Sequence, residues 1–462
     1  MPTTERLAII GLDSAEPSLV FERWRTELPN LAALADRGLW GRLESCIPPI
    51  TVPAWACMAS GRDPGELGIY GFRNRRDWTY ENLGIATNLE IRVPRLWDCV
   101  TQAGRPSIVV AVPPTFPLRN PPMGCMLTCF LTPSVESAFA HPPELAAELA
   151  ARFGPYCLDA EDFRTSDKAA LLERINAMTR QRMAICRHLV SARPWSLLWL
   201  VDLGIDRVHH GFWQYMDPEH HRYVAGHPLA GAIREHYRLV DEELGALLPL
   251  LDDGRTAIWV VSDHGAKRMD GGLCINDWLI QEGLLALKSL PTAPQPFDLA
   301  AVDWSRTRVW GEGGYYARLY VNKAGREPRG IVSDAEYEPL VCEVRRRLEG
   351  LVDHRDRPMG NRAYRPAELY RATNGAAPDL IALLGDLHWR GVGSVGNPSL
   401  YVFDADAGPD DANHAQQGMH ILVAPGGPRG ELDASIYDVF PTSQRLLGLP
   451  PTTDVRGRVL VG

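Results

Sequence analysis

The sequence predicts an α/β fold: a doubly wound, mostly parallel sheet flanked by helices, with a smaller inserted α+β cap. Three observations support this prediction. Short apolar runs that end in a polar residue or a glycine are typical of buried parallel strands. The longer stretches between them repeat apolar residues every three or four positions, and such alternation of strand and helix indicates a doubly wound sheet. One region is richer in Gly, Pro and short alternating pieces.

Five apolar runs are the expected strands. They are LAIIGLD at 7–13, SIVVAVP at 107–113, SLLWLVDLG at 196–204, AIWVVSDHG at 257–265 and HILVAPGG at 420–427. We expect all five to be buried parallel strands. Helical periodicity predicts helices at 142–154, 167–192 and 233–251, and a last helix within 434–450.

The Gly- and Pro-rich region interrupts this alternation before the last strand. It includes PTAPQP at 291–296 and GVGSVGNP at 391–398. We interpret residues 291–410 as an inserted cap or substrate subdomain. Residues 1–290 and 411–462 then form the core domain that carries the candidate site.

Composition limits the classes of partner and the compartment. The chain has 462 residues with 48 basic and 57 acidic side chains, a formal net charge of -9, which argues against a nucleic acid polymer as partner. Nine scattered cysteines favour reduced core thiols over a disulfide framework. The N-terminus lacks a signal-peptide pattern, and no apolar run reaches the roughly 18 residues of a membrane span. We therefore expect a cytoplasmic protein with no membrane partner, and a homo-oligomer stays open.

Acidic residues and histidines cluster at the ends of the expected strands, where open α/β sheets bind ligands. The candidates are Asp13, Asp206, His210, Asp263, His264 and, just before the last strand, His414. Asp206 and His210 are four residues apart, so a helix would project both from one face. Three carboxylates and three imidazoles suit a pair of divalent ions, with Zn²⁺ expected first and Mn²⁺ as the alternative.

Thr51 stands at the start of the helix-like segment TVPAWACMASG. One interpretation is a helix N-cap, because Pro53 lies early in the first turn and small or apolar residues follow. The other is a nucleophile. A helix N-terminus offers N–H groups to a phosphate, and a metal ion in contact with the hydroxyl would lower its pKa. The residues alone leave both interpretations open.

These motifs together resemble a known family. The order of Asp13, ITVPAW, DRVHHGFW, VVSDHG and NHAQQGMHILVAPG is similar to the type I phosphodiesterase/nucleotide pyrophosphatase branch of the alkaline phosphatase superfamily, and within it to the predicted phosphohydrolase/phosphomutase group. The resemblance covers nearly the whole chain. It implies an alkaline phosphatase-like core, two zinc ions and a covalent phosphothreonine intermediate.

The resemblance also implies a role for each candidate residue. One ion would be held by Asp206, His210 and His414, and the other by Asp13, Asp263 and His264. Thr51 would contact the second ion and act as the nucleophile. Relatives that are nucleotide pyrophosphatases carry an Asn three residues after this Thr. Ala54 occupies that position here, which argues against nucleotide pyrophosphatase activity.

We therefore expect a metal-dependent phosphoric ester hydrolase. A phosphodiesterase acting on a small nucleotide-like or other phosphorylated metabolite is the leading hypothesis, with a phosphomonoesterase or a phosphomutase as the alternative. A sulfatase is less favoured because Thr51 lies outside a C/S-x-P-x-R motif, and a catalytically silent binding protein is less favoured because every ligand position is filled. Candidate substrate-binding residues are Ala54, Arg75, Arg76, Lys267 and Arg268, since arginine and lysine can clamp an anionic group.

Overall fold

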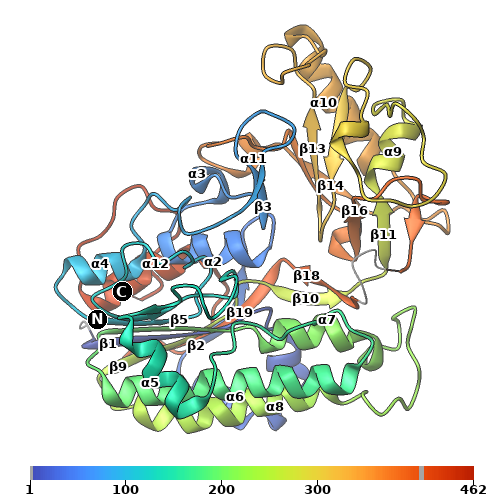
Figure 1. Cartoon of the computed structure of the whole chain (residues 1–462). Coiled ribbons are helices and arrows are strands. Elements are labelled where there is room, and N and C mark those ends of the chain that lie inside the picture. The colour runs from blue at the N-terminus through green and yellow to red at the C-terminus, as the bar shows by residue number, and fades with distance from the viewer. Residues whose placement is uncertain (1–3, 405–409, 462) are drawn as a thin grey trace. The chain divides into compact units, whose positions relative to one another are not determined.

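The computed structural model describes residues 4–404 and 410–461, which form two compact units (Figure 1). Unit 1 consists of Met1–Leu67, Ala86–Ala266 and His414–Gly462, and unit 2 consists of Gly68–Ile85 and Lys267–Asn413. The sequence predicted a different kind of division: a cap at 291–410 inserted into a core of 1–290 and 411–462. It was based on an inserted segment, whereas the two units are defined by compactness. The division into cap and core stays a prediction.

Unit 1 is built on a mixed, mostly parallel sheet of strand order β20-β2-β19-β9-β1-β8-β5-β6-β7, with β21 paired to β2. The strands are β1 (Arg6–Leu12), β2 (Leu39–Glu44), β5 (Ser107–Val110), β6 (Gly124–Leu127), β7 (Ala140–His141), β8 (Leu197–Asp202), β9 (Thr256–Val261), β19 (Gln417–Val423), β20 (Gly430–Glu431) and β21 (Ala434–Ser435). The neighbours from β9 to β6 run parallel. Every residue of β5, β8 and β9 is buried, as expected for strands covered on both faces. The predicted α/β fold is confirmed.

The direction of one strand was predicted wrongly. The sequence predicted a parallel strand at 420–427, but β19 pairs antiparallel with both β9 and β2. Its interior is buried as expected. A uniformly apolar run indicates burial on both faces, whereas the direction of a strand depends on the route of the chain that leads into it.

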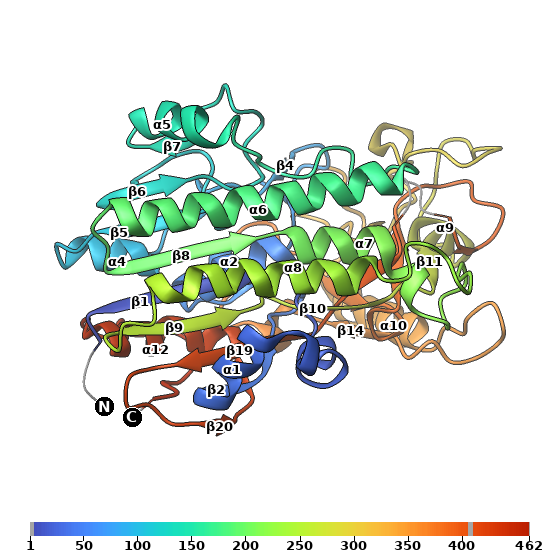
Figure 2. The same cartoon turned by 90° about the horizontal axis from the view of Figure 1, so that it is seen from below.

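Helices cover both faces of this sheet (Figures 1 and 2). One face carries α6 (Lys168–Ala192), α7 (Gly204–Met216) and α8 (Ala232–Leu247), and the other carries α2 (Thr51–Ser60), α4 (Leu96–Gln102) and α12 (Ile436–Leu447). The remaining helices of unit 1 are α1 (Pro29–Arg37), α3 (Pro64–Leu67) and α5 (Glu144–Phe153). The four helices predicted from periodicity correspond to α5, α6, α8 and α12.

Helix α2 packs tightly against β1. A Cβ atom on Gly11 would lie 2.4 Å from the Cη2 atom of Trp55, so only a glycine leaves room for this indole. All ten residues of α2 are buried. The contact anchors α2 beside the carboxyl end of β1, which is where the first candidate residue, Asp13, lies.

Unit 2 contains smaller sheets and its own hydrophobic core. One sheet has the antiparallel order β12-β13-β15-β14, another has the order β16-β11-β17, and β3 pairs with β4. These strands are β3 (Arg73–Arg75), β4 (Leu83–Ile85), β11 (Gly271–Cys274), β12 (Val309–Glu312), β13 (Ala317–Val321), β14 (Arg362–Tyr364), β15 (Leu380–Leu383), β16 (Trp389–Val392) and β17 (Tyr401–Val402). The helices are α9 (Ile275–Gln281), α10 (Asp334–Glu349) and α11 (Pro366–Leu369). Trp278, Trp304 and Trp310 belong to the core. Strands β10 (Gly265–Arg268) and β18 (Ala412–Ala415) cross from one unit to the other.

The nine cysteines are free thiols, as the sequence predicted. Among the described residues, no helix combines the length and the apolar character needed to cross a bilayer. The cytoplasmic location stays a prediction.

A buried histidine of α8 predicts how the stability of unit 1 depends on pH. His236 lies with Nδ1 2.8 Å from Oδ1 of Asn176, and burial lowers its pKa to about 4 from 6.5. Between these values the unfolded chain binds the proton and the folded chain does not, so stability falls as the pH falls below 6.5. We expect His236→Gln to flatten the pH dependence of the urea midpoint between about pH 7.5 and about pH 5. An unchanged dependence would contradict this assignment.

Candidate active site

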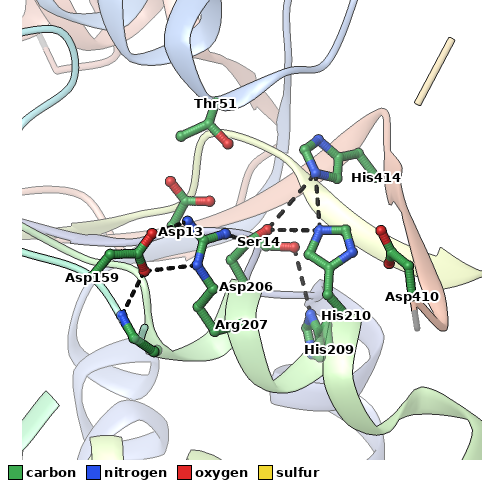
Figure 3. Close-up of polar contacts among 12 residues, drawn as sticks. Asp13, Ser14, Thr51, Asp159, Asp206, Arg207, His209, His210, Asp410 and His414 are labelled. Carbon is green, nitrogen blue, oxygen red and sulfur yellow. Dashed lines mark hydrogen bonds and ion pairs between the residues drawn. The ribbon is translucent and has the colours of Figure 1, made fainter. Parts of the chain in front are cut away.

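The residues predicted to form the site come together in unit 1 at the ends of its central strands. Asp13 follows β1, Asp263 and His264 follow β9, and α7 begins directly after β8. All seven are buried: Asp13, Thr51, Asp206, His210, Asp263, His264 and His414. Elements separated by about 400 residues of sequence therefore deliver carboxylates, imidazoles and one hydroxyl to a single region (Figure 3).

Carboxylate oxygens and imidazole nitrogens converge in two groups. Asp13, Asp263 and His264 form one group, and Asp206, His264 and His414 form the other, with the ligand atoms of each group within 4.8 Å of one another. His264 thus belongs to both. Nε2 of His210 lies 3.3 Å from Oδ1 of Asp206 and 3.3 Å from Nε2 of His414. All six predicted ligands are therefore close together; their division between two ions stays a prediction.

Two histidines are oriented by backbone carbonyls. Nδ1 of His264 lies 3.0 Å from the carbonyl oxygen of Gly265, and Nδ1 of His414 lies 2.8 Å from that of Pro49. With the proton on Nδ1 donated to the carbonyl, the lone pair of Nε2 faces the cluster, which is the arrangement of a metal-binding imidazole. His209 differs, because both of its nitrogens lie near hydroxyls, those of Ser14 and Tyr237.

One oxygen of each cluster carboxylate has no hydrogen-bond partner. These buried atoms are Oδ1 of Asp13, Oδ1 of Asp206 and Oδ2 of Asp263. A buried carboxylate oxygen without a partner is costly unless a cation balances it. Burial raises the pKa of Asp13 well above its usual value, and the neighbouring Asp206 raises it further. Burial and Asp13 likewise raise the pKa of Asp263.

The donor set fits divalent ions. Burial lowers the pKa of His264 to about 4 and lowers that of His414 well below its usual value, so both are neutral, as metal binding requires. Burial acts to raise the pKa of Asp206, but His210 and Arg207 hold it well below its usual value. Carboxylate oxygens and neutral imidazoles are ligands for Zn²⁺ and Mn²⁺. Two buried Asp/His triads are consistent with a binuclear metal site.

Thr51 is not the N-cap that the sequence predicted. The N-cap of α2 is Ile50, Thr51 is the first helical residue, and no side chain caps this end. The Thr51 hydroxyl lies instead 3.3 Å from Nε2 of His264. A threonine before a helix resembles a cap in sequence, but the extended backbone at Ile50 places the start of the helix one position earlier than expected. The hydroxyl is thereby left to face the cluster.

Sequence reasoning missed two groups that hold the carboxylates in place. The indole nitrogen Nε1 of Trp55 donates to Oδ2 of Asp13 over 2.7 Å. The backbone N–H of Ser14 donates to Oδ1 of Asp263 over 3.2 Å, with Ser14 at a left-handed φ of 65°. These donors occupy one oxygen of each carboxylate and leave the other oxygen for a cation. Trp55, four residues after Thr51, carried the only sequence signal, since a buried indole needs an acceptor.

The role of Trp55 predicts a metal-affinity defect. Trp55→Phe keeps the aromatic ring and removes the donor to Asp13, so we expect metal affinity to fall about 10- to 100-fold, as for other groups that orient metal ligands. Competition with a chromogenic chelator measures this affinity. Trp199→Phe is the matched control, because its buried indole nitrogen has no partner to lose. Equal affinities for the Trp55 variant and the parent protein would contradict the assigned role.

Arg207 is a third group that the sequence analysis missed, although it directly follows Asp206. Its Nη1 donates to Oδ2 of Asp206 over 2.6 Å. Nε and Nη2 donate to the two oxygens of Asp159 over 2.8 and 2.7 Å. The guanidinium also lies over the ring of Phe163, at 4.5 Å from its centroid. Arg207 thus links Asp206 to the loop between α5 and α6.

The candidate substrate-binding residues are divided between the two units. Ala54 is buried within α2. The others belong to unit 2, where Arg75 is buried in an ion pair with Glu327 at 3.4 Å, Lys267 pairs with Asp386 at 3.2 Å and Arg268 pairs with Asp270. Arg76 is exposed. An anion clamp by Arg75 would require it to leave its present partner. Substrate roles for these residues stay predictions.

Comparisons with known proteins bear on the family and the fold. A family model described as type I phosphodiesterase/nucleotide pyrophosphatase matches residues 7–420. The search of curated proteins gave no match. Among solved structures, the chain is similar to an inactive variant of murine ectonucleotide pyrophosphatase/phosphodiesterase 5 in complex with AMP, with 12% identity, a TM-score of 0.56, and coverage of 98% of this chain and 97% of that one. For the human protein of the same name, the identity is 14%, the TM-score is 0.55, and the match covers 98% of this chain and 97% of that one. At these identities the likeness shows the fold.

Proposed function

The chain belongs to the type I phosphodiesterase/nucleotide pyrophosphatase family, and on this premise we propose that it is a two-metal-dependent phosphodiesterase in which Thr51 is the nucleophile. One observation carries the proposal. Three buried carboxylate oxygens that accept no hydrogen bond, on Asp13, Asp206 and Asp263, converge with imidazole nitrogens, and the Thr51 hydroxyl lies 3.3 Å from one of those nitrogens.

The six Asp and His ligands would hold the two ions, with Zn²⁺ or Mn²⁺ as the expected metals. When bound, such ions stabilise charge on phosphoryl oxygens and lower the pKa of an adjacent hydroxyl. Without them, burial raises the pKa values of Asp13 and Asp263. The chain's own contribution is to orient the ligands through Trp55, Ser14 and Arg207.

Thr51 performs the covalent step. Its Oγ1 forms a bond to phosphorus while the bond from phosphorus to the leaving alkoxy group breaks and the alcohol departs with a proton, which gives a phosphothreonine ester. Water then attacks the phosphorus and releases a phosphate monoester and the free Thr51 hydroxyl. The backbone N–H groups of Thr51 and Val52 have no intrahelical acceptor and suit a phosphoryl oxygen, whereas Pro53 has no N–H.

The charge around the cluster favours a diester over a monoester. A monoester dianion carries one more negative charge than a diester and needs a further cation. Arg207 is the arginine that contacts a cluster carboxylate, but its charge is already balanced by Asp159 and Asp206. A singly charged diester therefore suits the site better.

A small nucleotide-like metabolite is the proposed substrate class. The support is the similar murine structure, which is described as a complex with AMP. The acidic net charge of -9 argues against a nucleic acid polymer, as noted above, and suits a small phosphate ester that enters a local metal site. A cytoplasmic location remains part of this proposal.

Chromogenic esters test the proposal. We expect the metal-loaded protein to hydrolyse bis(4-nitrophenyl) phosphate faster than 4-nitrophenyl phosphate, and 4-nitrophenyl sulfate not at all. Faster monoester hydrolysis would favour the phosphomonoesterase alternative, and isomer formation from a sugar phosphate without phosphate release would favour the phosphomutase. Absence of turnover of every ester by protein with two bound ions would overturn the proposal.

A further inference from the structure

An ion pair beside the cluster carries an inference about substrate choice. Arg207 lies on α7 directly after Asp206, and Asp159 lies in the loop between α5 and α6. The two side chains form a bidentate pair with N···O distances of 2.8 and 2.7 Å. Figure 3 shows the guanidinium between Asp159 and Asp206, and its charge also interacts with that of Asp13.

The guanidinium has little freedom to move. The Arg207 side chain is 10% exposed. The rings of Phe163 and Phe130 lie 4.5 and 5.7 Å from its Cζ atom, and Asp206 accepts from its third donor nitrogen. A fixed guanidinium next to two cluster carboxylates is a permanent charge at the candidate site. Three of its five N–H groups donate to carboxylates, so two more remain available for a ligand.

Asp159 removes most of the effect of that charge. Its carboxylate forms a bidentate pair with the guanidinium. In this geometry the two opposite charges are closest, so their combined electric field on a more distant group is weakest. Unlike Asp206, Asp159 lies outside the metal-ligating triads, and its side chain is 26% exposed. Its negative charge is therefore not needed to bind an ion or to complete a buried core. Asp159 therefore acts electrostatically: the Arg207–Asp159 pair presents no net charge to a substrate at the site.

We propose that Asp159 is a specificity-determining residue, which neutralises Arg207 and thereby disfavours doubly charged phosphate monoesters relative to singly charged diesters. This inference rests on the proposed function. Removal of the Asp159 charge would leave Arg207 paired with Asp206, whose charge the proposed function assigns to a metal ion, so the site would gain one unit of positive charge. Arg207 would then attract the extra negative charge of a monoester. The kcat/KM for the monoester would rise more than the kcat/KM for the diester.

The experiment compares two substrates with the same leaving group. Methyl 4-nitrophenyl phosphate and 4-nitrophenyl phosphate differ by one methyl group and one negative charge. We expect Asp159→Asn to raise the monoester-to-diester ratio of kcat/KM by roughly three- to tenfold. This is the effect of one unit of charge acting on the substrate through a partly solvated medium. Asparagine can still accept from Arg207, and the ratio cancels any loss of folded protein.

Three further variants separate the charge of Asp159 from a structural role. Asp159→Glu keeps the charge and should keep the parent ratio. The double variant Asp159→Asn with Arg207→Gln restores the net charge of the parent pair, so the monoester-to-diester ratio should return to the parent value. Both activities should fall, because Arg207 no longer orients Asp206. Glu243→Gln is the matched control, because Glu243 forms a similar pair with Arg187 at 2.6 Å without contact with the cluster.

The outcomes are distinct. An unchanged ratio in Asp159→Asn, with both substrates still hydrolysed, would overturn the inference and leave the phosphodiesterase proposal standing. An equal rise of the ratio in Glu243→Gln would also overturn it, because the effect would then reflect net charge alone. If the metal-loaded parent protein hydrolyses neither ester, the proposed function fails and the inference fails with it.

Discussion

Thr51→Ala is expected to lose roughly three to six orders of magnitude in kcat, the scale seen when a covalent nucleophile is removed. Ser14, another hydroxyl beside the cluster in the described part of the chain, is poorly placed to replace it, because its Oγ already lies 3.3 Å from the carbonyl of Gly265 and 3.5 Å from Nδ1 of His209. Thr51→Ser should keep measurable activity, since it retains the hydroxyl.

Stability distinguishes the nucleophile from a helix cap. Loss of a capping threonine costs about 1 kcal/mol, but Thr51 makes no capping hydrogen bond, so the urea midpoint of Thr51→Ala should stay close to that of the parent protein. Ser60→Ala is the matched control on the same helix, where the hydroxyl donates to the carbonyl of Ala56, and it should keep full turnover. Mass spectrometry of protein quenched during turnover of a diester should find Thr51 joined to a phosphoryl group that still carries the second ester substituent. An alanine variant as active as the parent would reduce Thr51 to a structural residue.

Metal removal is expected to abolish activity completely. The cluster places three carboxylates and three imidazoles in one buried region, and without a cation the pKa values of Asp13 and Asp263 are raised. Exhaustive chelation should remove both ions and all turnover, and Zn²⁺ or Mn²⁺ should restore it. Metal analysis should give two ions per chain. Full activity in the metal-free protein would exclude this site as the catalytic centre.

Single-ligand variants refine this expectation. His264 belongs to both triads, and His210 lies beside Asp206 and His414. His264→Gln should therefore weaken the ion assigned to Asp13 and Asp263, and His210→Gln the ion assigned to Asp206 and His414. His188→Gln is the control, because His188 pairs with Glu148 at 2.8 Å and is no part of the cluster. Retention of both ions at parent affinity by His264→Gln would contradict its role as a ligand.

Sequence patterns were sufficient for those parts of the protein that depend on local chemistry. Uniform apolar runs identified β1, β5, β8, β9 and β19, because a strand that is buried on both faces carries apolar residues at successive positions rather than alternating with polar ones. Periodicity identified α5, α6, α8 and α12. Asp13, Asp263 and His264 could be selected because ligands bind at the carboxyl ends of parallel strands, and the spacing of Asp206 and His210 required only one helical turn.

Features that depend on contacts between distant segments came from the folded chain. The antiparallel direction of β19 follows from the route of the chain, which the apolar pattern of 420–427 does not encode. Thr51 faces His264 because α2 begins one residue earlier than its sequence suggests and is held against Gly11 through Trp55. Arg207 and Asp159 are 48 residues apart, and no local pattern pairs them. Burial and periodicity are properties of neighbours in sequence, whereas orientation, pairing and shared ligands arise only when the sheet brings separate strand ends to one place.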